Sequence, residues 1–172
     1  MAFTFKVEDG TGYADSNSYV SVADADDYFV IQPTSDAVWN PLTSTQKEQY
    51  LALATRYLDQ KVDWRGEIAD EDQALRWPRT GAYTRDQIAV GSTVVPKPVK
   101  AATCELALYL ISNDPNAGQD VDKLKKIVVD VVEIEYQEGA GQPKIPSLIN
   151  SILYGLGFFV SGGRGFGRIV RA

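Results

Sequence analysis

The chain has 172 residues, of which 44% are hydrophobic, so it can fill the core of one domain and is not globally disordered. It contains no histidine and one cysteine, Cys104, which excludes histidine-based catalysis and a disulfide framework within the chain. The net charge of −6 combines an acidic body, with 13 Lys and Arg against 23 Asp and Glu in residues 1–143, and a basic end, with 4 Lys and Arg and no acid in residues 144–172.

An extended N-terminal arm is predicted for residues 1–20, followed by a short helix. Apolar residues alternate with polar ones between Phe3 and Val7, which is a weak strand pattern. The helix is expected to begin after Ser21, whose hydroxyl can cap its first turn, and to end at Pro33, which cannot continue a helix.

A longer helix is predicted from residues 41–46 to about residue 60. The segment before it offers several caps, one of them Thr45 with Glu48. Apolar residues then recur at helical spacing and form one stripe, which consists of Tyr50, Leu51, Ala54, Tyr57 and Leu58.

Residues 62–97 are predicted to form an irregular loop in which tryptophans stand beside arginines. Such a pattern can stack single-stranded bases. It can equally be structural, with the tryptophans fixing the loop to the helices and the arginines bonded to carbonyl groups. Six acids in or beside the loop would repel phosphate, which favours the structural interpretation. The residues of this structural loop are Trp64, Trp77, Pro78 and Arg79.

A third helix is predicted from Pro98 to about Ser112. Its apolar residues surround most of its circumference, so it is either central in the core or partly buried by a neighbouring subunit. Cys104 lies among these apolar residues and is expected to be an inert, buried thiol. The side chains expected to pack between subunits are Leu106, Leu110 and Ile111.

The C-terminal third is predicted to contain a strand at 127–136, a short helix from Pro146 to about Tyr154 and a tail at 159–172. The fold class is therefore mainly α. We expect a small helical bundle at 21–158 with an irregular Trp-rich loop, a short β element and an extended C-terminal arm.

The predicted tail is glycine-rich, basic and without periodicity, so it should be flexible on its own. Apolar side chains nevertheless interleave with its arginines, which a solubilising tail would not need. Extended peptides with such anchors commonly add to a sheet edge or fill a groove. We expect the tail to dock on a partner protein through Arg164, Phe166, Arg168, Ile169, Val170 and Arg171.

No pattern in the chain predicts an enzyme, a cofactor or a metal site. The carboxylate clusters at 24–27 and 70–72 lack the spacing of a calcium loop, although a subunit that uses carboxylates and a metal remains an alternative. No apolar run approaches the roughly 20 residues of a membrane helix, so we expect no membrane partner.

Several blocks in residues 15–112 resemble a tailed-bacteriophage family. Members of that family are labelled DnaT-like single-stranded-DNA-binding proteins, and they also resemble head-to-tail adaptors, the connector or head-completion proteins of virions. The blocks are Ser18–Ala25, Trp39, Ala54–Asp59, Trp64–Gly66, Gln73–Arg79 and Lys100–Ala107.

The resemblance implies a structural virion protein that forms a ring, expected to be dodecameric, below the portal. In that role the ring joins the capsid to the tail and lines the conduit through which double-stranded DNA passes during packaging and ejection. The implied partners are the portal protein, neighbouring copies and the next neck or tail-completion protein. The implied location is the virion neck, after assembly in the host bacterial cytoplasm. The alternative is a single-stranded-DNA-binding replication accessory protein.

Overall fold

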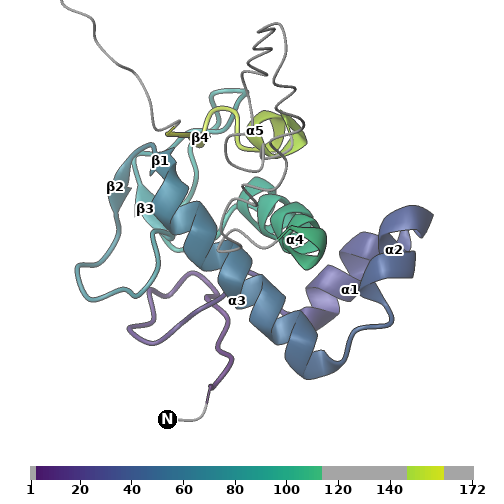
Figure 1. Cartoon of the computed structure of the whole chain (residues 1–172). Coiled ribbons are helices and arrows are strands. Elements are labelled where there is room, and N and C mark those ends of the chain that lie inside the picture. The colour runs from purple at the N-terminus through teal and green to yellow at the C-terminus, as the bar shows by residue number, and fades with distance from the viewer. Residues whose placement is uncertain (1–2, 114–146, 161–172) are drawn as a thin grey trace, which may run out of the picture.

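The structure is a computed structural model, and it describes residues 3–113 and 147–160. Within these ranges the chain is mainly helical, as predicted, with short two-stranded sheets (Figure 1). The predicted strand at 127–136 and the docking residues of the predicted tail lie outside the described residues. In chain order, the elements are α1 (Val22–Val30), α2 (Pro33–Trp39), α3 (Ser44–Lys61), β1 (Val62–Trp64), β2 (Glu67–Ile68), β3 (Arg79–Thr80), α4 (Lys97–Ser112), α5 (Ser147–Ile152) and β4 (Gly157–Phe159).

Helices α3 and α4 pack against each other and form the centre of the core (Figure 1). Helix α4 is also contacted by α1, α2 and α5, which explains why its sequence is apolar on most sides. Leu106 and Leu110 are buried inside the chain, and Ile111 is partly buried against the same core. Leu106 and Leu110 are therefore used within the subunit and are not open to a neighbouring copy.

Helix α1 begins at the predicted cap, but the segment after it differs from the prediction. Ser21 Oγ accepts a hydrogen bond from the N–H of Asp24 at 3.0 Å. Pro33 follows α1 and is also the first residue of α2, because its fixed φ suits a first helical turn. The sequence did not predict α2, because the same proline was interpreted as the end of α1. Trp39 at the end of α2 is buried, and its Nε1–H donates to Asp26 at 2.7 Å.

Helix α3 begins at Ser44, inside the 41–46 segment for which the sequence offers several caps. Thr43, not Thr45, is the capping residue, and it forms a reciprocal capping box with Gln46. This start places Lys47 in the first turn, where its Nζ lies 2.8 Å from Asp26 Oδ1 and joins α3 to α1.

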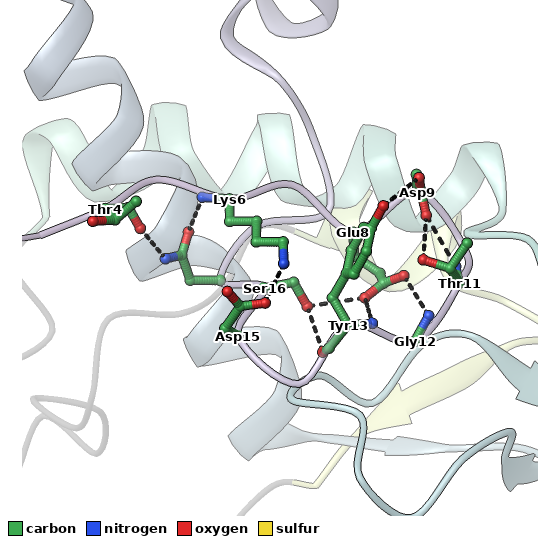
Figure 2. Close-up of polar contacts among 10 residues, drawn as sticks. Thr4, Lys6, Glu8, Asp9, Thr11, Gly12, Tyr13, Asp15 and Ser16 are labelled. Carbon is green, nitrogen blue, oxygen red and sulfur yellow. Dashed lines mark hydrogen bonds and ion pairs between the residues drawn. The ribbon is translucent and has the colours of Figure 1, made fainter.

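Residues 3–20, predicted as an extended arm, fold back into a loop around a buried carboxylate. Glu8 is fully buried and accepts hydrogen bonds at 2.9 Å from the N–H groups of Gly10, Gly12 and Tyr13 and from the hydroxyl of Ser16. Figure 2 shows the carboxylate of Glu8 between Tyr13, Gly12 and Ser16. Because four donors satisfy this carboxylate, its burial holds the loop closed.

The Trp-rich loop is fixed from inside the domain. Trp64 and Trp77 are buried with their ring centroids 5.9 Å apart in an edge-to-face arrangement, and Pro78 is buried beside them. The guanidinium of Arg79 is largely buried and donates to the carbonyl oxygens of Arg65, Arg76 and Gly66. These bonds tie the turn after β1 to the segment that leads into β3.

Strand β4 brings the C-terminal part of the described chain back to the end of α3. It pairs antiparallel with β1, with Val62 opposite Phe159. The N–H of Val160 then donates to the carbonyl oxygen of Lys61 at 2.8 Å. The chain therefore remains bonded to the helical domain as far as Val160. The tail was predicted to start at residue 159, so its first two residues belong to the folded domain.

Candidate functional site

A groove of about 700 Å³ lies along the polar side of α3, between two loops. The α3 residues that line it are spaced three or four apart, so they share the side of the helix opposite to buried Leu51 and Leu58. The folded N-terminal loop forms one wall, and the segment from β2 to residue 76 forms the other (Figure 1). Its lining includes Phe3 and Asn17, then Gln49, Leu53, Arg56, Asp59 and Gln60 of α3, and Ile68, Glu71, Gln73, Leu75 and Arg76.

Arg56 and Arg76 bring positive charge to the groove from its floor and from one wall. Both side chains are exposed. The three salt bridges among the described residues all use lysines, so neither guanidinium is engaged by a carboxylate there. An arginine in this state offers a planar set of donors that fits a phosphate group.

The groove also offers open apolar and amide groups. The side chain of Phe3 lines the groove and is half exposed. Leu53 and Leu75 also line the groove and are partly buried. Gln49 and Gln60 are exposed, and their amides form no hydrogen bond with another described residue. A flat apolar ligand group with polar edges, such as a nucleobase, matches this combination.

Asp59 lies on the groove floor and holds one wall in place. Its carboxylate accepts hydrogen bonds from the hydroxyl of Tyr19 at 2.5 Å and from the N–H of Arg76 at 3.0 Å. The Tyr19 hydroxyl in turn accepts from the N–H of Trp77 at 3.2 Å. Burial raises the pKa of Asp59 to about 6, although these hydrogen bonds act in the opposite direction. Burial and the neighbouring Asp59 also raise the pKa of Tyr19.

The two tryptophans of the Trp-rich loop are not open to a ligand. The exposed fraction of Trp64 is 7% and that of Trp77 is 0%, so neither ring can stack on a base. Their indole N–H groups are buried and have no hydrogen-bond partner in the described part of the chain. Both side chains therefore contribute through apolar packing.

Three further features bear on the chemistry and location that the described residues could support. Burial raises the pKa of the Cys104 thiol to about 12, so this thiol is protonated at neutral pH and is a poor nucleophile. Across residues 3–113 and 147–160, no cluster of three or more acidic or cysteine side chains is placed to hold a metal ion. No helix in the same ranges has both the length and the apolar character needed to cross a membrane.

Sequence reasoning did not find the groove residues. Their signal in the sequence is the polar stripe of α3, in which Gln49, Arg56 and Gln60 recur at intervals of seven and four residues. A polar stripe usually marks a solvated helix face, and only the two loops that flank α3 turn this one into a groove. Those loops are placed by long-range contacts such as the one between Asp59 and Tyr19.

In a comparison with protein families, residues 3–172 match a family model described as "Putative DnaT-like ssDNA binding protein". No curated protein and no solved structure matches the chain. The family match overturns the head-to-tail adaptor interpretation, including the ring of copies, the portal protein and the neck proteins as partners. It agrees instead with the alternative interpretation, a single-stranded-DNA-binding protein.

Proposed function

We propose that this chain, which belongs to the DnaT-like single-stranded-DNA-binding family, binds single-stranded DNA in the groove along α3. The observation that carries the proposal is the family match over nearly the whole chain. The groove supports it because its two arginines and its open ring bring together the kinds of group that single-strand sites use.

Each part of the groove has a role in this proposal. Arg56 and Arg76 contact the phosphates of the strand, because both guanidinium groups face solvent without a carboxylate partner among the described residues. Phe3 stacks on a base, and Gln49 and Gln60 donate to or accept from base edges. A duplex keeps its bases stacked and paired, so it cannot offer base faces to Phe3, and we expect the groove to prefer a single strand.

The charge of the protein limits the affinity of this site. The net charge of −6 repels the phosphate backbone outside the groove. With phosphate contacts from two arginines, the slope of log K against log salt concentration should be about −1.4. We therefore propose moderate, salt-sensitive binding and no catalytic step, as suits a replication accessory protein that holds a strand for other proteins.

Fluorescence anisotropy with a labelled oligothymidylate tests this function. The wild-type protein should bind the single strand, bind a duplex of the same length more weakly, and lose affinity between low and physiological salt. The double variant R56A/R76A should lose about tenfold or more in affinity. A suitable control is Lys97→Ala, which removes an exposed positive charge outside the groove lining.

Two outcomes would refute the proposal in different ways. Absence of single-strand binding by the wild-type protein at low salt would remove the function itself. Equal affinity of R56A/R76A and the wild-type protein would leave DNA binding intact but would place it outside the α3 groove.

A further inference from the structure

A second surface with exposed aromatic rings lies at the C-terminal end of α3. We call it the aromatic surface and define it by Arg85, Tyr154 and Phe158. The exposed fractions of Tyr154 and Phe158 are 64% and 54%, which are high for aromatic side chains in a folded domain. The guanidinium of Arg85 lies 5.4 Å from the centroid of the Tyr154 ring, within cation–π range.

The backbone holds this arrangement in place. Gly155 follows Tyr154 with a φ of +97°, and a Cβ added there would lie 2.7 Å from the backbone nitrogen of Arg85. The loop that carries Arg85 is thus packed directly on the turn that carries Tyr154. Strand β4 begins two residues later and presents Phe158 opposite Asp63 of β1.

The strand β4, which carries Phe158, is bonded to the chain at the end of α3. Gln60 lines the groove in the last turn of α3, and β1 starts two residues later. Val160, at the end of β4, is hydrogen-bonded to Lys61. In Figure 1 the β1–β4 pair accordingly lies at the C-terminal end of α3. The end of β4 therefore lies beside the last turn of α3, in which Gln60 lines the groove.

We propose that the bound single strand continues from the groove across the aromatic surface, with bases stacked on Tyr154 and Phe158 and with Arg85 beside the backbone. This inference rests on the proposed function of the groove. The aromatic rings supply sequence-tolerant stacking, and Arg85 has no carboxylate partner among the described residues that would compete with a phosphate. The groove and this surface together form one binding path along two sides of β1.

One acid on this path makes the inference testable by a gain of affinity. Asp63 is exposed and faces Phe158 across the β1–β4 pair, so its negative charge repels a passing phosphate. Replacing Asp63 with Asn removes this repulsion without changing the size of the side chain. A longer strand should then bind more tightly, whereas a strand confined to the groove should be unaffected.

The experiment compares a short oligothymidylate of about four nucleotides with a long one of about twelve, within the usual range of single-strand site sizes. Tyr154→Ala should weaken binding of the long strand about tenfold and leave the short strand unchanged, whereas Tyr154→Phe should keep most of the affinity. Asp63→Asn should strengthen binding of the long strand about two- to threefold by removing one unit of repulsion. Leu148→Ala on α5 is the control, because Leu148 is exposed but has no arginine partner.

The outcomes separate this inference from the proposed function. If Tyr154→Ala and Asp63→Asn leave binding of the long strand unchanged while R56A/R76A weakens binding of both strands, the path across the aromatic surface is refuted. Binding in the α3 groove is then retained. Equal loss for both strands in Tyr154→Ala would also overturn the path, because the variant would then act on the groove itself. If the wild-type protein binds neither strand, the path and the proposed function both fall.

Discussion

The Trp-rich loop and the α3 groove use similar residues in opposite ways. In the loop, Arg79 is largely buried and bonded to carbonyl oxygens, and Trp64 and Trp77 face inward. In the groove, Arg56 is exposed and has no ionic partner in residues 3–113 and 147–160, and Phe3 is half exposed to solvent. Arginines beside aromatic rings therefore do not define a nucleic-acid site by themselves. The two regions differ in whether the N–H groups of the arginines already donate hydrogen bonds to other described residues of the protein.

The largest expected effect tests the structural role of the Trp-rich loop. Trp77→Ala should lower the free energy of unfolding by about 3–5 kcal/mol, because it leaves a large cavity in the core. Trp77→Phe should cost much less, because the buried indole N–H has no hydrogen-bond partner to lose among the described residues. Urea unfolding followed by circular dichroism measures both. If the phenylalanine variant were as unstable as the alanine variant, the indole N–H would have an essential partner.

The next effect concerns the N-terminal loop that forms one wall of the groove. Glu8→Gln should lower the free energy of unfolding by about 2–3 kcal/mol, because an amide cannot accept from all four donors around the buried carboxylate. Asp15→Asn removes an exposed carboxylate of the same loop and should change stability by less than about 0.5 kcal/mol. Chemical unfolding of the two variants side by side decides whether burial of Glu8 is what closes the loop.

A smaller effect should appear in the dependence of stability on pH. The folded pKa of Asp59 is about 6, above the ordinary value of 3.8, so the folded state takes up this proton at a higher pH than the unfolded state does. The contribution of Asp59 to stability should therefore increase by roughly 2 kcal/mol as the pH falls from about 6 to about 4. Above pH 6 this contribution is absent.

Asp59→Asn is the matched variant for this prediction. Its stability should lack the increase between pH 6 and pH 4 that Asp59 supplies in the wild-type protein. Thermal unfolding across that range makes the comparison. If the two proteins show the same pH profile there, Asp59 titrates normally and its burial has no energetic consequence.

The smallest expected effect is on the salt dependence of DNA binding. Arg56→Ala removes one phosphate contact, so the slope of log K against log salt concentration should become less steep by about 0.7. Arg65→Ala removes an exposed arginine that does not line the groove and should change the slope less. Anisotropy titrations at several salt concentrations give both slopes. An unchanged slope for Arg56→Ala would mean that this arginine does not meet a phosphate.

The helices were largely predictable because their signals are local. The Ser21 cap marks the start of α1, and the apolar stripe around Leu51 and Leu58 marks α3. The helix α2 was missed because Pro33 signals the end of one helix and the beginning of the next with the same residue. The closure of the N-terminal segment was not predicted for a different reason. It depends on the burial of Glu8, and acidic residues are usually exposed.

The groove and the function of the protein were harder to predict, because both depend on how distant segments of the chain are placed in the fold. The groove joins Phe3, Arg56 and Arg76, which come from three separate segments of the chain. The overall acidic balance argues against DNA binding, yet it averages over the whole chain and does not reveal Arg56 and Arg76, which form no ion pair within the described ranges. The resemblance of residues 15–112 was interpreted as one to head-to-tail adaptors. The adaptor role attached to it was wrong, because the family match is to a single-stranded-DNA-binding description.

Ultraviolet cross-linking of the wild-type protein to an oligothymidylate, followed by mass spectrometry of the linked peptides, tests the central claim most directly. If the strand lies in the α3 groove, cross-links should form on the peptides that contain Phe3 and residues 49–60, and on the 68–76 segment. Cross-links confined to α1 and α2, which do not line the groove, would contradict the account.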